Sequence, residues 1–203
     1  MAHSVRRIII IIRRTFTFTV SKITVILYLE KIGGAVEMKL LRIPVGVSDF
    51  AEIRRNGYYY VDKSGLIGEL LGTTGTKVTL ITRPRRFGKT LGMSMLESFF
   101  DIRKDNKTLF EGLEIANRHD LCTEWMNQWP TVFVSFRQVD GLNFNSAYGM
   151  LTLVISELYK KHLYLLDSDK VDGYDKEIVK QLIQGTASAK DTKGSLMLLT
   201  RLM

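Results

Sequence analysis

Three consecutive residues, Gly88, Lys89 and Thr90, have the types and the order that are typical of phosphate binding. A run rich in β-branched residues at 78–82 precedes them and predicts a buried strand, and an apolar run at 91–100 predicts a helix. In a loop between such elements, backbone amides and the helix N-terminus direct hydrogen-bond donors at an anion. Lys89 would place its charge on the terminal phosphates of a nucleotide, and the Thr90 hydroxyl would coordinate Mg²⁺. The order of strand, loop and helix is that of a P-loop and predicts a nucleotide-binding site.

The loop departs at one position from the usual motif G-x-x-x-x-G-K-[ST]. Arg83 stands where the motif has its first glycine, so the chain must turn with Arg83 and Pro84, whose ring fixes φ near the value of a turn. A basic surface turn is the alternative interpretation, but the flanking strand and helix favour nucleotide binding. The candidate nucleotide-binding residues of the loop are Arg83, Pro84, Arg85, Arg86, Phe87, Gly88, Lys89 and Thr90.

Three stretches of the sequence resemble the AAA-ATPase-like family, namely residues 43–50, 57–63 and 82–90. The family carries the same Arg-Pro-Arg-Arg-Phe-Gly-Lys-Thr loop, so the arginine at 83 conforms to its pattern. The resemblance extends from about Met38 to the end of the chain. It implies a P-loop fold that binds ATP with Mg²⁺. In its members this domain often precedes a nuclease-like domain of the PD-(D/E)XK type, which would bring nucleic acid as a partner.

Asp62 and Lys63 follow a run of tyrosines at 58–60, and both recur in the family that the sequence resembles. The resemblance therefore makes them candidate residues of the nucleotide site. For the tyrosines, packing in the core or at a sheet edge is favoured over stacking on adenine. Asp62 also has a local role, because its side chain can cap a helix over residues 63–71.

Composition bounds the class of protein. The chain has 203 residues, of which 45% are hydrophobic, and this suffices for one domain, or for one domain with an appendage. Its net charge is +8, but residues 1–37 hold half of the excess, and the mild remainder does not by itself indicate nucleic-acid binding. Cys122 is the only cysteine, which excludes an internal disulfide and a cysteine-based metal cluster and suits the cytoplasm.

Residues 1–37 differ from the rest of the chain. An isoleucine run at 8–12 lies between arginine pairs, and Arg13, Arg14 and Lys22 interrupt every window long enough to span a membrane. An added hairpin, a membrane-surface segment and translated sequence upstream of the true start are the open interpretations. We favour the last, because residues 31–34 can be encoded by a ribosome-binding sequence shortly before Met38. The expected division is an atypical extension at 1–37 and, at 38–203, the N-terminal part of an AAA-ATPase-like domain.

The later part of the chain alternates between strand and helix patterns. Asp49 fits the cap of a short helix, residues 131–136 predict a second buried strand, and Asn143 fits the cap of a long amphipathic helix. Two more helices are expected, one ended by Gly185 and one begun at Ser188. The pattern predicts an α/β, P-loop NTPase-like layered fold, with an incomplete parallel sheet flanked by helices.

Hydrolysis requires an acidic pair at the end of a hydrophobic strand, to hold Mg²⁺ and polarise water. The strand expected at 131–136 is followed by Arg137, and Asp140 lies too far beyond it. In the resembled family the acidic strand comes after the helices that close this chain, so we expect a truncated ATPase domain that binds ATP without hydrolysing it alone. The alternatives are a non-functional gene remnant and a basic nucleic-acid-binding module that uses Lys77, Arg83, Arg85, Arg86 and Lys89.

Overall fold

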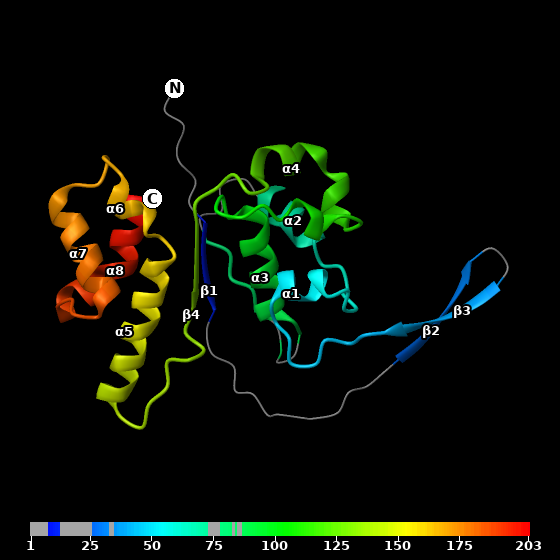
Figure 1. The fold of residues 1–203 in the computed structure, drawn as a ribbon, viewed down its shortest axis with the longest axis horizontal. Coiled ribbons are helices and arrows are strands. Elements are labelled where there is room, and N and C mark those ends of the chain that lie inside the picture. The colour runs from blue at the N-terminus through cyan, green and yellow to red at the C-terminus, as the bar shows by residue number, and fades with distance from the viewer. Residues whose placement is uncertain (1–7, 13–25, 33–34, 73–77, 83, 85–86) are drawn as a thin grey trace. The chain divides into compact units, whose positions relative to one another are not determined.

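A computed structural model describes residues 8–12, 26–32, 35–72, 78–82, 84 and 87–203, with side chains from Arg42 onward (Figure 1). The chain divides into two compact units. One combines Met1–Thr15 with Pro130–Met203, and the other is Phe16–Trp129. The expected boundary between residues 37 and 38 stays a prediction, and a strand runs through it.

The unit Phe16–Trp129 begins with a hairpin and continues as short helices. In the hairpin, Ile26 pairs with Leu41 and Ile32 with Ala35 in antiparallel register. The elements of this unit, in chain order, are β2 (Ile26–Ile32), β3 (Ala35–Leu41), α1 (Phe50–Arg55), α2 (Gly65–Gly72), α3 (Lys89–Phe100), the 3₁₀ helices η1 (Lys107–Phe110) and η2 (Glu114–Asn117), and α4 (His119–Trp125).

The predicted cap of α1 is confirmed. The Asp49 carboxylate accepts a hydrogen bond of 2.7 Å from the Glu52 amide, which satisfies a donor that has no partner within the helix. The helix ends at Arg55 with Asn56 as its C-cap, and Gly57 follows with a φ of 60° in the left-handed region that glycine adopts without strain.

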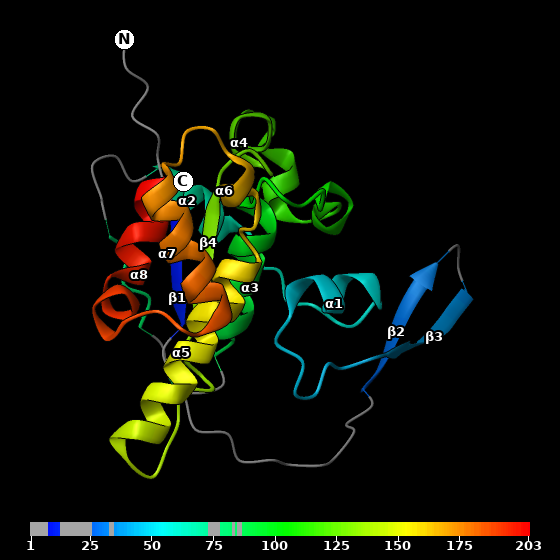
Figure 2. The ribbon, with the colours of Figure 1, turned by 60° about the vertical axis from the view of Figure 1, so that its left-hand side comes forward.

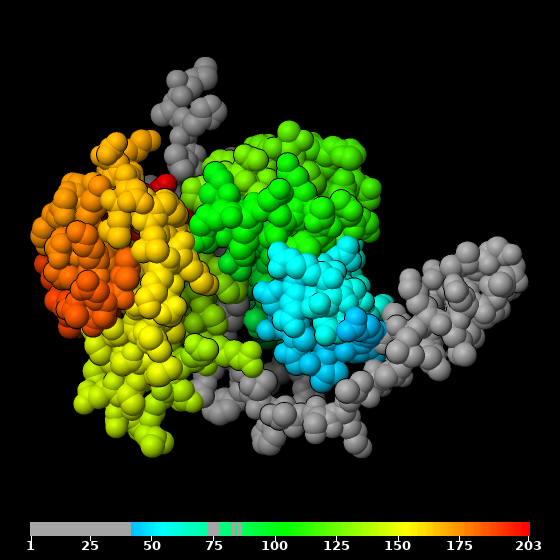
Figure 3. Space-filling model, in the orientation of Figure 1, coloured from blue at the N-terminus to red at the C-terminus, as the bar shows by residue number. Residues whose placement is uncertain are grey.

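Aromatic side chains form the centre of this unit. Phe50, Phe99 and Phe110 are almost fully buried, and their rings pack with centroid separations of 4.9 Å between Phe50 and Phe110 and 5.3 Å between Phe99 and Phe110. Helix α1 contacts η1, and in Figure 3 the cyan part of the chain lies directly against the green part. This packing holds α1 and η1 against α3, whose first residues carry the predicted phosphate-binding sequence.

The prediction of a buried strand at 78–82 is wrong. These residues have an irregular conformation, and Val78 and Leu80 are 82% and 83% exposed. The preference of β-branched residues for strands reflects packing against neighbouring strands rather than an intrinsic backbone tendency. In the part of the chain that the structure describes, no strand pairs with this segment, so its apolar side chains have no sheet against which to pack.

The other unit joins two distant segments in a parallel pair. Strand β1 (Ile8–Ile12) pairs with β4 (Thr131–Ser135), from Ile8 opposite Thr131 to Ile12 opposite Ser135. The predicted strand at 131–136 is thereby confirmed, with Val132 and Val134 only 2% exposed. Figure 2 shows the helices that follow β4. They are α5 (Phe144–Lys160), α6 (Tyr164–Asp167), α7 (Gly173–Gln184) and α8 (Ala189–Leu202).

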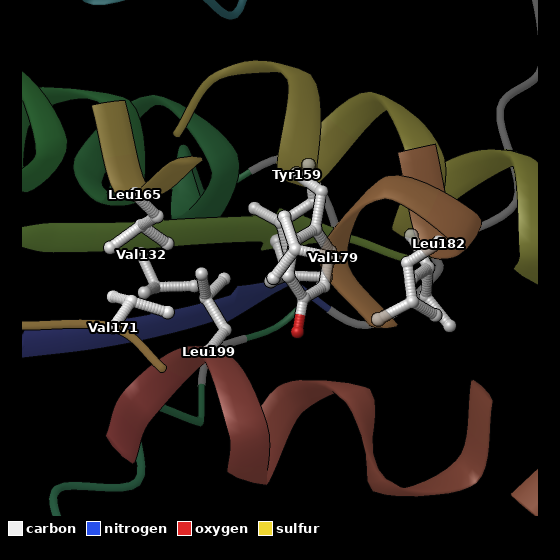
Figure 4. Close-up of a cluster of buried hydrophobic side chains, with 10 residues drawn as sticks. Val132, Tyr159, Leu165, Val171, Val179, Leu182 and Leu199 are labelled. Atoms are coloured by element: carbon white, nitrogen blue, oxygen red, sulfur yellow. The ribbon is translucent and has the colours of Figure 1, made fainter. Parts of the chain in front are cut away.

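A second core lies between these helices and β4 (Figure 4). Val132 of β4, Tyr159 of α5, Val179 of α7 and Leu199 of α8 contribute to it, and the Tyr159 hydroxyl donates a 2.7 Å hydrogen bond to the Ser195 carbonyl. Burial raises the pKa of this phenol well above its ordinary value.

The three predicted helix signals in this unit are confirmed. Asn143 and Ser188 accept hydrogen bonds from the amides of Ser146 and Asp191, and Gly185 ends α7 with a φ of 73°. The predicted α/β fold is confirmed in part. Helix and strand are mixed and helix predominates, and the described strands form one parallel and one antiparallel pair rather than a larger sheet.

Candidate functional site

Gly88 gives the loop its turn into α3. Its φ of 76° and ψ of 23° lie in the left-handed region, where a residue with a Cβ atom is strained. The Gly88 carbonyl accepts a 2.8 Å hydrogen bond from the Gly92 amide and so begins the helix. The amides of the first helical turn have no intrahelical acceptor, and they are the donors that an anion at this end of α3 would meet.

Two lysines from different elements reach the same loop. The Lys89 Nζ donates a 3.0 Å hydrogen bond to the Pro84 carbonyl, and the Lys63 Nζ donates one of 3.1 Å to the Phe87 carbonyl. A Cβ atom built on Gly88 would lie 3.6 Å from the Lys63 Nζ. The sequence predicted both lysines as site residues, and the structure brings both ammonium groups to the loop.

Asp62 and Ser64 fasten η2 to the start of α2. One Asp62 carboxylate oxygen accepts a 2.8 Å hydrogen bond from the Ser64 amide, and the other accepts one of 2.7 Å from the Glu114 amide. The Ser64 hydroxyl accepts a 3.1 Å bond from the Ile115 amide. Desolvation raises the pKa of the Asp62 carboxyl, but the hydrogen bonds from the Glu114 and Ser64 amides outweigh it, so that pKa lies below its usual value. Asp62 therefore holds the backbone of η2 in place at this site.

A pocket of about 940 Å³ opens beside the loop. The loop and α3 contribute Phe87, Gly88, Lys89, Gly92 and Met93 to its lining. The rest of the lining includes Lys63, Gly65 and Gly68 of α2, and η2 with the adjoining Arg118. The pocket thus combines cationic groups at the loop with a glycine-containing helix face.

Several predicted residues lie outside the described part of the chain. They are Lys77, Arg83, Arg85 and Arg86, whose roles stay predictions. Pro84 is exposed and Phe87 is 57% exposed, while Thr90 is half-buried in the first turn of α3. Among the described residues, no cluster of three or more His, Cys, Asp or Glu side chains could hold a metal ion. Thr90 as a Mg²⁺ ligand therefore also stays a prediction.

Comparison with known proteins decides the family. The family described as "Predicted AAA-ATPase" matches residues 44–199, a stretch that contains the loop, both lysines and every residue named for the pocket. The chain belongs to the AAA-ATPase-like family. The resemblance inferred from the sequence is confirmed, and the match covers most of the chain.

One relative of this AAA-ATPase-like chain is the "Uncharacterized protein in vnfD 5'region" of Azotobacter chroococcum mcd 1. The two are 39% identical over 100 residues, which cover 49% of this chain and 18% of the relative. The chain therefore matches less than a fifth of the relative's length. No solved structure matches the chain. None of the helices that the structure describes has the length and apolar character needed to cross a membrane.

Sequence reasoning missed part of the pocket of this AAA-ATPase-like chain. Gly65, Gly68, Glu114 and Arg118 line it, and none of them belongs to the loop motif. Glycines three positions apart on a predicted helix were the available signal, because they leave one helix face without side chains. No comparable signal points to Glu114, which lies far from Gly65 along the chain.

Proposed function

We propose that this chain binds ATP with Mg²⁺ and that the loop at the start of α3 holds the phosphates. The main support is the geometry of the loop. Gly88, in the left-handed region, directly precedes α3, and the ammonium groups of Lys89 and Lys63 both contact carbonyls of the loop beside a pocket. Amides, a helix N-terminus and two cations directed at one place match the charge of a triphosphate.

Each residue then has a separate role. Lys89 binds the terminal phosphates from the loop itself, and Lys63 approaches the same phosphates from the α2 side. Gly88 allows the backbone to come close to the anion, and Arg83, Arg85 and Arg86 add positive charge around it. Pro84 and Phe87 shape the turn. Thr90 supplies one oxygen ligand to Mg²⁺, which normally keeps several waters and takes its other ligands from the phosphates.

The proposal is limited to binding, and hydrolysis is not expected of this chain alone. Strand β4 ends at Ser135 and is followed by Phe136 and Arg137, so it brings no carboxylate to its carboxyl end. A P-loop NTPase-like arrangement of the sheet belongs to the same proposal. Within the unit formed by Met1–Thr15 and Pro130–Met203, the parallel pairing of β1 and β4 and the packing of α5 on β4 support the parallel-sheet part of this proposal.

Calorimetry with Mg-ATP on the full chain tests the proposal. Lys89→Ala should weaken binding at least about tenfold, because a hydrogen bond to a charged group contributes about 1.5–3 kcal/mol. Lys107→Ala is the matched control, since it removes the same charge from an exposed position on η1 outside the pocket lining.

A folded wild-type chain that does not bind Mg-ATP would refute the proposal. Equal weakening by both substitutions would also refute it. If that weakening came with a steep dependence on salt, it would indicate the general anion attraction expected of a nucleic-acid-binding surface.

A further inference from the structure

Glu114 lies against the first residue of α2, in the lining of the pocket. A Cβ atom built on Gly65 would stand 2.7 Å and 2.9 Å from the two oxygens of the Glu114 carboxylate. Real Cβ atoms do not come so close to other atoms, so a side chain at position 65 would move the flexible end of Glu114 away from this place. Both residues belong to the pocket lining.

The backbone of Glu114 is held in place by other residues. Its amide donates to Asp62 at 2.7 Å, and the next amide, that of Ile115, donates to the buried Ser64 hydroxyl at 3.1 Å. The backbone from which the carboxylate reaches Gly65 is therefore held in place. A side chain presented from a fixed backbone loses less conformational freedom when it binds a ligand.

The order of groups along α2 follows the order of the parts of a nucleotide. Lys63, just before the helix, contacts the phosphate-binding loop, and Gly65 with the Glu114 carboxylate comes next. Gly68 lies about 4.5 Å farther along the axis, where its Cβ position is 3.7 Å from an Arg118 nitrogen. In a nucleotide the ribose lies between the phosphates and the base, so Glu114 is at the level of the ribose and Arg118 at that of the base.

The chemistry of a carboxylate agrees with this placement. A carboxylate accepts hydrogen bonds through two oxygens and donates none, which suits two adjacent hydroxyl donors. Acidic residues bind the ribose hydroxyls of dinucleotides in this manner. The guanidinium of Arg118, paired with Asp120 at 3.3 Å, is planar and can stack on a base.

We propose that Glu114 binds the ribose 2′- and 3′-hydroxyls of the nucleotide and that the chain thereby selects ribonucleotides over 2′-deoxyribonucleotides. The inference rests on the proposed function, because it takes the phosphates to be at Lys89. It adds a sugar-recognition site that lies outside the loop motif and requires glycine at position 65.

The test compares four ligands by calorimetry on the full chain with Mg²⁺ present, namely ATP, 2′-deoxy-ATP, GTP and inorganic tripolyphosphate. The wild type should bind ATP at least about tenfold more tightly than 2′-deoxy-ATP. In Glu114→Ala that ratio should fall to about one, with the affinity for tripolyphosphate unchanged. Gly65→Ala should reduce the ratio in the same way, because its methyl group displaces the carboxylate. Glu111→Ala is the control, since it removes an equal charge from an exposed position outside the pocket lining.

The outcomes separate this inference from the proposed function. Tripolyphosphate binding that is absent, or that is insensitive to Lys89→Ala, overturns both. If tripolyphosphate binds as expected, equal affinities of the wild type for ATP and 2′-deoxy-ATP overturn the ribose assignment alone. A preference that survives in Glu114→Ala does the same. Loss in that variant of a preference between ATP and GTP, rather than between the two sugars, would assign the carboxylate to the base and overturn the inference. Thermal unfolding of each variant verifies that it is folded.

Discussion

Replacing Asp62 should loosen the attachment between α2 and η2, and the structure sets the size of the effect. Asp62→Ala removes two hydrogen bonds from backbone amides, one from Ser64 and one from Glu114. Loss of one side-chain cap of this kind costs about 1 kcal/mol. Because Asp62 is exposed, water replaces part of each bond, so we expect a loss of about 1–2 kcal/mol in the free energy of unfolding.

Asp62→Asn should give a smaller loss of stability in the same measurement. An amide side chain has one acceptor oxygen instead of two, so this variant should keep one of the two bonds and lose about half as much. Asp105→Ala removes an equal charge from an exposed loop position and serves as the control. Urea unfolding gives the free energies, and hydrogen exchange should show faster exchange of the Glu114 amide in the alanine variant.

The direction of the pH dependence follows from the lowered pKa of Asp62. A carboxyl whose pKa is lower in the folded state stabilises the fold above its unfolded pKa, and this contribution is lost as the pH falls through the folded value. The difference between wild type and Asp62→Ala should therefore be full near neutral pH and shrink in acid. Equal stability of wild type, Asp62→Ala and Asp105→Ala at pH 7 would refute the reasoning.

Three further predictions concern single positions. Gly88→Ala should destabilise the fold by about 1 kcal/mol and weaken Mg-ATP binding, because alanine is strained at a φ of 76°; unfolding and calorimetry measure the two effects. Asn127→Ala should cost about 3 kcal/mol in urea unfolding, since the buried amide bonds the carbonyls of Ser98 and Asp101 at 3.1 Å and 3.0 Å. Asn127→Gly, which suits the φ of 55°, should lose slightly less. Tyr60 should ionise at about pH 12 in ultraviolet titration, because burial raises its pKa, so its contribution to stability is lost only above pH 10.

Local signals in the sequence predicted local structure well. The caps at Asp49, Asn143 and Ser188 were predictable because a cap needs only a side-chain acceptor and an amide three residues later. Gly88 and Lys89 were likewise evident from consecutive residues of the loop. These features depend on short stretches of chain, which the sequence displays directly.

Features that depend on distant residues were not predictable in this way. The run at 78–82 has strand composition, but whether it joins a sheet depends on a neighbour from elsewhere in the chain. Glu114 reaches Gly65 only because Asp62 and Ser64 bind the backbone of η2. No motif spacing encodes that contact, so this part of the pocket lining required the structure.

The pairing of β1 with β4 has a consequence for the order of folding. Its two strands lie on either side of the whole Phe16–Trp129 unit, so the pairing closes a loop that contains every residue of that unit. Contacts between such distant segments form slowly, because the entropy of loop closure is lost before the contact is gained. During synthesis the chain emerges at about 5–20 residues per second, and Phe16–Trp129 is complete before β4 appears. We therefore expect the inserted unit to fold first on the ribosome, while β1 stays unpaired until β4 has been synthesised.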